Sequence, residues 1–319
     1  MSYIVTGGAG FVGSNMVRKL NSNGISDVVI IDNYDEAKMP NLLGLHFTDY
    51  IDYADGLEAV RTALEQLDNV EGVFHIGANA DVLESDPKVM MTMNYEFSKM
   101  YYNYAKNRSI PFVYASSSAV YGNNDRQDGG LDDLMPHNIY AWSKWLFDKY
   151  VDAHNDNING RKVVGFRFFN VFGWGEFHKG KNANIVYRFY RMVRDNGVID
   201  LFKDEIRRDH VFVGDVAEVM YNAMTTDNFP NGIHNLGGNH PVSHRRVAEV
   251  VVETMMEEGV IDKKETEEYI RLIDMPADLR EKFQFYTYAE GQQEYVTAIT
   301  KGNEEKMRDY VRMLIRKGK

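Results

Sequence analysis

The regular alternation of short apolar runs with longer helical patterns constrains the fold of this chain more than any other feature of its sequence. We expect buried strands at 3–6, 28–31, 73–76, 112–117 and 163–168. These runs are apolar almost throughout, which is typical of parallel strands that are covered on both faces. Strands that alternate with helices in this way predict an α/β fold with a doubly wound parallel sheet.

Apolar residues at helical spacing mark the segments between these strands. Met16, Val17 and Leu20 form one such stripe. A second stripe of methionine and aromatic side chains has two interpretations, a ligand-binding surface or a helix face turned toward the core, and we expect the core face. The second stripe comprises Met90, Met93, Phe97, Tyr101 and Tyr104.

The alternation becomes less regular beyond about residue 170. Residues 173–184 predict a polar, glycine-containing loop, and a helix should follow it, marked by Ile185, Phe189 and Met192. The remainder is expected to be mostly helical, with the charged stretch 257–269 as a solvated face.

Two later segments are expected to return to the sheet, a strand near 211–213 and the run 232–238. The chain is therefore predicted to have a second, smaller unit that is not continuous in sequence. We assign the sheet domain to 1–170, with its return near 208–236, and a discontinuous C-terminal substrate lobe to 171–207 and 237–319.

Composition excludes several classes of protein. The chain has 319 residues, 44% of them hydrophobic, and no low-complexity tract, so a folded globular protein is expected. The net charge of −11 disfavours binding to nucleic acid. The lack of cysteine excludes disulfides, thiolate metal sites and a cysteine nucleophile, and the nine histidines show no metal-ligand spacing. With no leader-like start and no membrane-length apolar run, we expect a soluble cytoplasmic protein.

The sequence TGGAGFVG at 6–13 follows the first predicted strand and opens the first predicted helix. Its glycines, Gly7, Gly10 and Gly13, permit a tight turn and allow the backbone to approach a pyrophosphate, while the helix N-terminus supplies N–H donors. This context predicts a dinucleotide cofactor on a Rossmann-type sheet.

The second predicted strand ends at Asp32, about 20 residues beyond the glycines, where an acid accepts the hydroxyls of a ribose. Such an aspartate favours NAD. However, Asn33 can donate hydrogen bonds, and Lys38 is close enough in sequence to neutralise the 2′-phosphate of NADP. These residues alone leave the choice between NAD and NADP open.

The sequence YAWSK at 140–144 places a tyrosine and a lysine four residues apart, on one face of a helix. A neighbouring ammonium group, together with the positive ring of the cofactor, lowers the pKa of a phenol from its ordinary value of about 10. Tyr140 could then take a proton from a substrate hydroxyl while hydride leaves for a nicotinamide. A serine hydroxyl at the end of the strand 112–117 would hold the same oxygen.

These motifs together resemble the extended short-chain dehydrogenases/reductases, the group of nucleotide-sugar epimerases, dehydratases and reductases. The resemblance covers nearly the whole chain and includes SSSAVYG, YAWSK, FRFFNVFG and RRDHVFVGDVAEV. It implies that Ser117 is the catalytic serine, and that Ser116 and Ser118 are structural. Dehydratases of this group carry an Asp–Glu pair directly after the catalytic residue. Ser118 and Ala119 stand there instead, so dehydration is not expected.

Longer stretches, above all EFHKGKNA at 176–183, resemble the ADP-glycero-manno-heptose 6-epimerases. This resemblance implies that Lys179 is a second acid/base opposite Tyr140. It also implies transient oxidation at C6 of the heptose by bound NADP, and a homo-oligomer, often a pentamer, serving lipopolysaccharide synthesis. The cofactor residues it implies are Gly7, Gly10, Phe11, Val12, Gly13, Asp32, Asn33, Lys38, the 76–80 segment with Ile76, Gly77 and Ala78, Asn94, Tyr140 and Lys144. The substrate residues that we expect are Asn170, Val171, Lys181, Arg188, Phe202, Arg208 and Phe283.

Four of the departures of the chain from that group are single-residue replacements. Tyr53 replaces a lysine near the adenosine phosphate, Lys181 a serine, Arg188 a histidine, and Phe283 a tyrosine at the sugar site. Because Lys181, Arg188 and Phe283 lie around the expected substrate, an epimerase or an NADPH-dependent keto-reductase for another nucleotide sugar is the alternative. A non-catalytic NADP-binding regulator is disfavoured because Ser117, Tyr140 and Lys144 are all present.

Overall fold

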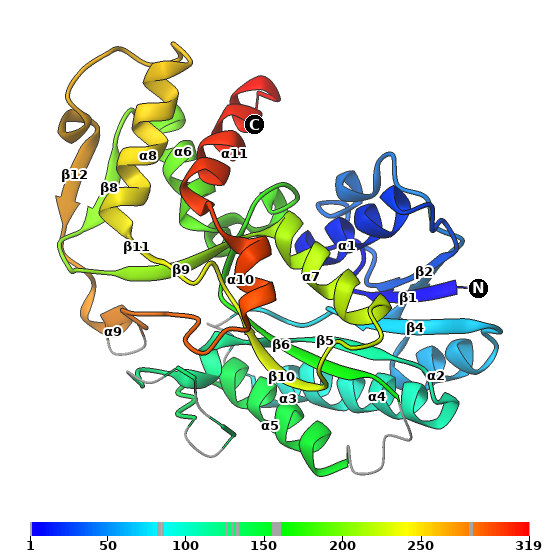
Figure 1. Ribbon diagram of the computed structural model, residues 1–319. Helices are drawn as coiled ribbons and strands as arrows, with labels where there is room; N and C mark the ends of the chain where they lie inside the picture. The colour runs from blue at the N-terminus through cyan, green and yellow to red at the C-terminus, as the bar shows by residue number, and fades with distance from the viewer. Residues whose placement is uncertain are drawn as a thin grey trace.

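A seven-stranded parallel sheet forms the centre of the protein (Figure 1). The structure is a computed structural model, and it describes residues 2–81, 84, 86–124, 127, 128, 130, 131, 134–154, 161–280 and 283–318. The strand order is β3-β2-β1-β4-β5-β6-β10. Its strands are β1 (Ser2–Thr6), β2 (Val28–Asp32), β3 (Asp49–Asp52), β4 (Val70–His75), β5 (Phe112–Ser117), β6 (Val163–Phe168) and β10 (Gly232–Leu236).

Helices cover both faces of this sheet, as the apolar strand sequences require. On one face, Val5 of β1 packs in a cluster with α1 (Phe11–Ser22) and α7 (Val213–Thr225). On the other face, Ile4 packs with α2 (Leu57–Glu65), α4 (Phe97–Arg108) and α5 (Ile139–His154). Adjacent residues of one strand therefore enter opposite cores, and the predicted doubly wound sheet is confirmed.

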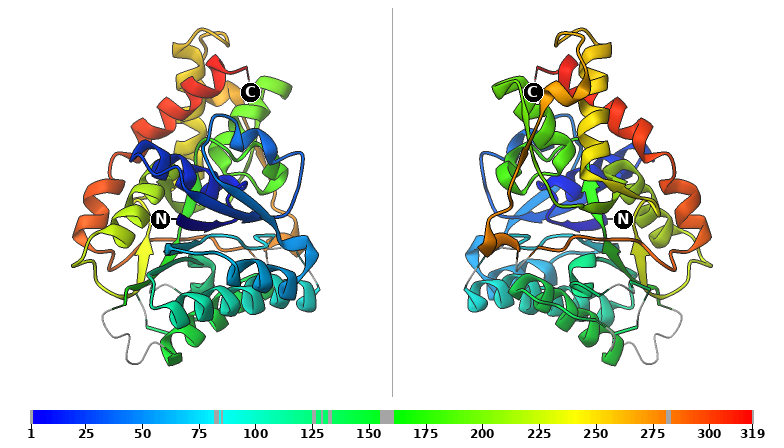
Figure 2. Two further views of the ribbon diagram at one scale, coloured as in Figure 1. Left: turned by 90° about the vertical axis from the view of Figure 1, so that its right-hand side faces the viewer. Right: turned by 90° about the vertical axis from the view of Figure 1, so that its left-hand side faces the viewer.

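A smaller group of elements has its own core beside the carboxyl end of the sheet (Figures 1 and 2). A three-stranded sheet in the order β11-β9-β7 and a two-stranded sheet, β12-β8, belong to it. The strands are β7 (Asn170–Phe172), β8 (Ile199–Phe202), β9 (Arg207–Phe212), β11 (Pro241–Ser243) and β12 (Ile270–Ile273). The helices that pack around this core are α6 (Ile185–Asn196), α8 (His244–Glu257) and α11 (Asn303–Arg316).

Several shorter helices complete the described chain. The 3-10 helices are η1 (Met39–Leu42), η2 (Tyr53–Asp55), η4 (Ser118–Tyr121), η5 (Phe177–Asn182) and η6 (Thr266–Tyr269). A π-helical turn, η3 (Thr92–Glu96), joins α3 (Pro87–Met91) to α4. The remaining helices are α9 (Ala277–Arg280) and α10 (Glu294–Thr300), and Val296 of α10 packs in the same cluster as α7.

One sequence prediction for the second half of the chain is wrong. The strand predicted near 211–213 is β9, which pairs with β7 and β11 and not with the large sheet, so in the described part of the chain only β10 returns to it. The charged stretch 257–269 is largely exposed, as predicted. Helix α8 ends at Glu257, and the stretch then forms turns and the short η6.

The strand order reverses between β1 and β4. From β1 the chain proceeds outward to β2 and β3, whereas β4, β5 and β6 extend the sheet on the other side. The crevice outside the carboxyl ends of the strands at such a switch point is the common ligand site of open α/β sheets.

Candidate active site

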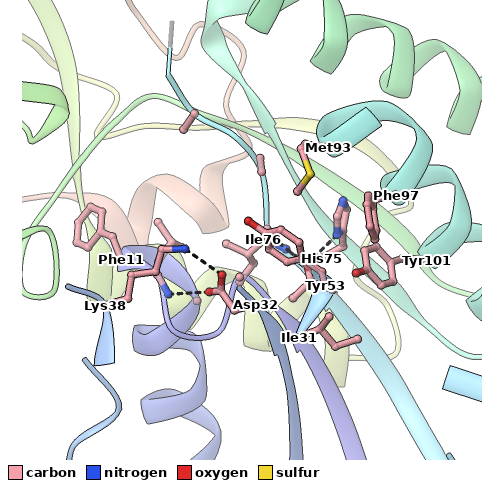
Figure 3. A pocket seen from close by; sticks show the side chains of 18 of the residues that line it. Phe11, Ile31, Asp32, Lys38, Tyr53, His75, Ile76, Met93, Phe97 and Tyr101 are labelled. Atoms are coloured by element: carbon pink, nitrogen blue, oxygen red, sulfur yellow. Dashed lines mark hydrogen bonds and ion pairs between the residues drawn. The ribbon is translucent and has the colours of Figure 1, made fainter. Parts of the chain in front are cut away.

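The residues at this switch point enclose a cavity of about 860 Å³, part of it open to solvent. Figure 3 shows Phe11 and Lys38 at one end and Phe97 and Tyr101 at the other. The lining residues are Thr6, Gly7, Gly10, Phe11, Val12, Gly13, Ile31, Asp32, Lys38, Tyr53, His75, Ile76, Gly77, Ala78, Ala80, Met93, Phe97, Tyr101, His178 and Lys179.

The glycine turn between β1 and α1 packs so tightly that side chains are excluded from it. Gly7 adopts φ +68°, and a Cβ atom there would lie 2.7 Å from Cα of Gly77. A Cβ atom on Gly13 would lie 2.0 Å from the carbonyl oxygen of Gly7. The turn thus presents bare backbone and the start of α1 to the cavity, which is the arrangement that a pyrophosphate needs.

Asp32, at the end of β2, is buried and already fully hydrogen-bonded. Its Oδ2 accepts from the backbone N–H of Ala9 at 3.0 Å and of Gly10 at 3.2 Å. Its Oδ1 accepts from the Lys38 ammonium at 3.1 Å, and the amide oxygen of Asn33 accepts from both Lys38 and the Tyr53 hydroxyl. Asn33 itself is outside the cavity lining, and it positions Lys38 and Tyr53 at the rim.

The 76–80 segment is held by a chain of hydrogen bonds whose proton positions can be assigned. The Ser98 hydroxyl donates to the carbonyl oxygen of Asn94 at 2.6 Å, so it must accept from Nε2 of His75 at 2.7 Å. Nδ1 of His75 is then the acceptor for the Thr6 hydroxyl at 2.8 Å. The Thr6 oxygen accepts from the N–H groups of Ile76 and Gly77, at 3.1 and 3.0 Å. Burial lowers the pKa of His75 and keeps it neutral, as this network requires.

Asn94 lies in the π-helical turn, fully buried behind the cavity rather than in its lining. Its amide oxygen accepts from the Asn79 N–H at 2.7 Å, and its amide nitrogen donates to the Asn79 carbonyl oxygen at 2.9 Å. The same nitrogen donates at 3.0 Å to the hydroxyl of Ser143, which donates to the carbonyl oxygen of Tyr140 at 2.7 Å. Asn94 therefore connects the 76–80 segment to the first turn of α5.

The stripe of methionine and aromatic residues serves both of the purposes that its sequence suggested. Met90, Phe97, Tyr101 and Tyr104 are buried in the core, as predicted. However, Phe97 and Tyr101 also line the cavity together with Met93. The helix face is thus continuous from the core into the site.

Ser117, Tyr140 and Lys144 meet where β5 ends and α5 begins, beside the cavity but outside its lining. Lys144 is buried, and its ammonium donates to the carbonyl oxygen of Ala115 at 2.9 Å. The Ser117 oxygen accepts from the N–H of Ala119 at 3.2 Å. The fold therefore brings together the three residues that the sequence singled out.

The expected lowering of the phenol pKa is not a property of the protein chain alone. Burial raises the pKa of Tyr140 above 10.0, and the contact with the Ser117 hydroxyl opposes this rise. Burial also lowers the pKa of Lys144 to about 8, while the charge of Asp148 acts in the opposite direction. The Lys144 ammonium donates to the Ala115 carbonyl oxygen. The lowering of the Tyr140 pKa by this ammonium together with the positive ring of the cofactor stays a prediction.

Lys179 lies at the cavity on the loop 173–184, which connects β7 to α6. Its ammonium lies 5.5 Å from the centre of the Phe11 ring, at the start of α1. Two side chains fasten this loop to the glycine turn. Asn41 donates to the carbonyl oxygens of Ala9 and Gly175, both at 3.1 Å, and Asn15 donates to the carbonyl oxygen of Trp174 at 2.7 Å. Burial lowers the pKa of Lys179.

Arg208 of β9 is the best-organised residue of the expected substrate side. Its guanidinium lies 5.1 Å from the centre of the Phe283 ring and donates to Oε1 of Gln284 at 3.1 Å. Gln284 in turn donates to the carbonyl oxygen of Gly122 at 2.6 Å. Phe202 packs edge-on against Phe283, with ring centres 6.5 Å apart. Burial lowers the pKa of Arg208 to about 10.

Arg188 of α6 belongs to the same basic region as Arg208. The charges of both arginines lower the pKa of His244, which burial lowers most. Within the described residues, no ion pair joins Arg188 or Arg208 to a carboxylate. The region therefore carries uncompensated positive charge.

The remaining predicted substrate residues lie in different surroundings. The Asn170 amide donates to the Asp209 carbonyl oxygen at 2.9 Å and to the Thr287 hydroxyl at 3.0 Å, so it links β7 to β9. Val171 is half-buried, and its carbonyl oxygen accepts from Asn184. Lys181 is exposed, outside the cavity lining.

Sequence reasoning missed Gln284, Glu176 and Asn41. Gln284 had no motif of its own, and Asn41 lies in a stretch without periodicity. Glu176 stands inside the EFHKGKNA segment, but nothing in the pattern shows that its side chain is buried. In the part of the chain that the structure describes, no group of three or more acidic or histidine side chains is placed to hold a metal ion. None of the described helices has both the length and the apolar character needed to span a bilayer.

A family model for the NAD dependent epimerase/dehydratase family matches residues 3–237. The match spans most of the chain and includes the glycine turn, Ser117, Tyr140, Lys144 and Lys179. The chain belongs to this family of nucleotide-sugar enzymes, and a nicotinamide dinucleotide is its cofactor.

Solved structures with the same fold act on several different sugars. Helicobacter pylori ADP-L-glycero-D-manno-heptose-6-epimerase is 25% identical, with a TM-score of 0.80 over 98% of this chain and 96% of the other. Thermus thermophilus UDP-glucose 4-epimerase, in complex with NAD, is 26% identical, with a TM-score of 0.76 over 98% of each chain. The UDP-N-acetylglucosamine 4-epimerase of Methanobrevibacter ruminantium has a TM-score of 0.82 over 99% and 98% of the two chains, and at 24% identity it shares the fold.

Proposed function

We propose that this protein is a nucleotide-sugar epimerase that interconverts ADP-D-glycero- and ADP-L-glycero-D-manno-heptose at C6, with NADP as a retained cofactor. The observation that carries this proposal is the position of Lys179. Asn41 and Asn15 hold its loop against the glycine turn, so that the amine shares the cavity with the cofactor residues. Epimerisation needs acid/base groups on both faces of one carbon, and Lys179 and Tyr140 come from different elements to supply them.

One observation, which does not depend on any related protein, supports a dinucleotide in this cavity. Side chains at Gly7 and Gly13 would collide with backbone atoms, so the turn can only present N–H groups and the start of α1. Asp32 and Tyr53 would hold the adenosine end, and the 76–80 segment would hold the opposite side. When bound, the dinucleotide supplies a reversible hydride acceptor.

Lys38 supports NADP as the preferred form. Its ammonium neutralises Asp32 at 3.1 Å and also contacts Asn33. An ionised Asp32 repels a 2′-phosphate, whereas the Lys38 ammonium attracts one and is already at the rim. With Tyr53 in place of a second lysine, Lys38 is the main cationic side chain for this selection.

The chain's own residues divide the proton transfers between two sides. Tyr140 would take the proton of the C6 hydroxyl on one face, with the Ser117 hydroxyl holding the same oxygen. Lys144 would orient this pair from the next turn of α5. After the keto group has rotated to present its other face, Lys179 would deliver a proton to the oxygen. In the reverse reaction, Lys179 would take the proton and Tyr140 would deliver it.

The basic region of Arg208 and Arg188 supports a substrate that carries a diphosphate. Arg208 has a guanidinium fork suited to phosphate oxygens, and no carboxylate competes for it among the described side chains. Phe202 and Phe283 would pack against the nucleoside or sugar beside it. Lys181 would contribute a flexible positive charge at the entrance.

A second candidate function is 4-epimerisation of a UDP-sugar. The observation that favours it is the comparable similarity to the Thermus thermophilus UDP-glucose 4-epimerase, 26% against 25% for the heptose epimerase. A keto-reductase that consumes NADPH is the remaining alternative, because it would use the same Ser117, Tyr140 and Lys144.

The first experiment incubates purified protein, without added cofactor, with ADP-D-glycero-β-D-manno-heptose and follows the C6 epimer by NMR. Appearance of the L-glycero epimer is expected. UDP-glucose in a parallel tube tests the 4-epimerase, and NADPH absorbance with a keto-sugar tests the reductase. No conversion of the heptose, with or without NADP, refutes the proposed substrate.

Variants then test the residues. Tyr140→Phe and Lys179→Met should each lower kcat at least about 100-fold, the usual contribution of a proton-transferring side chain. The exposed Tyr34→Phe and Lys301→Met serve as matched controls and should retain full activity. Wild-type rates in Lys179→Met would show that one acid/base group suffices.

A further inference from the structure

Glu176 is a completely buried carboxylate within the loop that carries Lys179, and the proposed reaction does not use it. A carboxylate removed from water needs strong hydrogen bonds or a counter-charge. Glu176 accepts hydrogen bonds from both ends of this loop, and it also lies within the electrostatic influence of the Lys179 ammonium.

The hydrogen bonds of Glu176 close the loop 173–184 at its two ends. One carboxylate oxygen accepts from the Gly173 N–H at 3.2 Å, and the other accepts from the Asn184 N–H at 2.5 Å. The backbone also contributes, because the Glu176 carbonyl oxygen accepts from the Lys179 N–H at 2.9 Å. A single side chain thus joins the end of β7, the start of α6 and the 3-10 turn that bears the amine.

The charge of Glu176 acts on Lys179 directly. Burial lowers the pKa of Lys179, and the Glu176 carboxylate is the charge that opposes this change. In the reverse direction, burial raises the pKa of Glu176 to about 7, while Lys179 and the two N–H groups oppose that rise. Each group therefore favours the charged form of the other.

Other titratable groups near the pair come from three elements. Tyr310 of α11 contacts Glu176, and Tyr187 of α6 lies beside Tyr310. On the cavity side, His178 lies next to Lys179 and also experiences the charges of Lys38 and Asp35. None of these groups supplies a second carboxylate to Lys179, and Glu176 is the charge that opposes the effect of burial on its pKa.

We propose that Glu176 is a positioning residue for Lys179, which fixes the loop that carries the amine and favours its protonated form. The proposal rests on the proposed function in that it takes Lys179 as the second acid/base of the reaction. Glu176 itself does not need to touch the substrate.

A titration of Lys179 tests this inference without relying on the enzyme reaction. Purified wild-type and Glu176→Gln proteins are labelled with limiting acetic anhydride across pH 6–11, and acetylation of Lys179 is measured by peptide mass spectrometry. Only the neutral amine reacts. Loss of the carboxylate should move the midpoint to lower pH by about one unit, the effect of one neighbouring charge, and raise labelling near neutral pH about tenfold.

Asn184→Ala is the matched control. It loosens the same end of the loop, because the Asn184 amide donates to the carbonyl oxygens of Asn170 and Val171, but it removes no charge. We expect it to leave the Lys179 midpoint unchanged. The inference is overturned if Glu176→Gln keeps the wild-type midpoint, or if Asn184→Ala shifts it equally.

Two further measurements separate this inference from the proposed function. In the epimerase assay, the pH limb that Lys179 controls should shift to lower pH in Glu176→Gln and return to the wild-type position in Glu176→Asp. If Lys179→Met retains full activity, the proposed function fails while the acetylation result still stands. If Lys179→Met is inactive and no midpoint shifts, the role of Glu176 fails alone.

Discussion

Replacing Asp148 by asparagine tests how the catalytic helix is held against the sheet. Asp148 lies one turn after Lys144 on α5 and is fully buried. Its Oδ2 lies 3.4 Å from Nε of the buried Arg167 and accepts from the Ser116 hydroxyl at 2.9 Å. Its Oδ1 accepts from the Tyr114 hydroxyl at 3.1 Å. The carboxylate thus joins α5 to β5 and β6.

The expected cost follows from the burial of this pair. Two unit charges 3.4 Å apart attract each other by about 5 kcal/mol at an effective dielectric constant near 20. Asparagine keeps an oxygen for one hydroxyl but removes the negative charge 3.4 Å from Arg167, and breaking a buried pair in this way costs about 3–5 kcal/mol. We therefore expect the free energy of unfolding to fall by about 3 kcal/mol. The pKa of Lys144 should also fall below its value of about 8, because Asp148 no longer supports its charge.

Urea unfolding at pH 7.5, followed by circular dichroism, measures this cost. The exposed ion pair of Asp195 with Arg191, at 2.8 Å, provides the control, and Asp195→Asn should cost less than about 1 kcal/mol. The double variant Asp148→Asn/Arg167→Met removes both buried charges and should be more stable than Asp148→Asn. The reasoning is refuted if Asp148→Asn costs no more than Asp195→Asn, or if the double variant is the less stable one.

Three further predictions follow from other parts of the structure. Gly13→Ala, whose Cβ would lie 2.0 Å from a backbone oxygen, should cost about 1–3 kcal/mol of stability and abolish retention of the dinucleotide. Gly130→Ala is the control, because a Cβ atom there meets open space, and it should change neither property. Urea unfolding measures the stability, and cofactor absorbance of the purified protein measures the retention. Gln284→Ala should raise KM about tenfold (~1.4 kcal/mol) with little change in kcat, because Arg208 loses its partner, and an effect on kcat alone would contradict this. Burial lowers the pKa of His210 to about 3, so the free energy of unfolding falls as the pH is lowered below 6.5. Between pH 6.5 and 5, the free energy of unfolding of His210→Gln should fall by about 2 kcal/mol less than that of the wild type. Equal decreases in the two proteins, measured by urea unfolding at each pH, would disprove this.

The sequence by itself determined the elements that local physics controls. A buried parallel strand must be apolar on both faces, so β1, β2, β4, β5 and β6 could be read directly from their composition. The glycine turn was equally clear, since its crowding against Gly77 tolerates no side chain. The spacing of Tyr140 and Lys144 likewise predicted that the two side chains share one face of a helix.

The pairing of the strands could not be predicted from the sequence. β3 is a short edge strand of sequence DYID with little apolar content, so it gave no signal. β9 has the composition of a sheet strand, but its partners, β7 and β11, are set by how the chain packs around the second core. The amino-acid composition of a segment indicates that it is buried, but it does not indicate which element covers it.

The tertiary structure alone decided the environment of the candidate acid/base groups. Lys179 is far from the glycine turn in sequence, and the hydrogen bonds of Asn41 and Asn15 hold its loop there. Glu176 and Tyr140 have shifted pKa values because folding removes them from water. The physical reason is common to all of them: desolvation and hydrogen bonding depend on atoms that are distant along the chain, whereas sequence patterns record only the neighbours within a few residues.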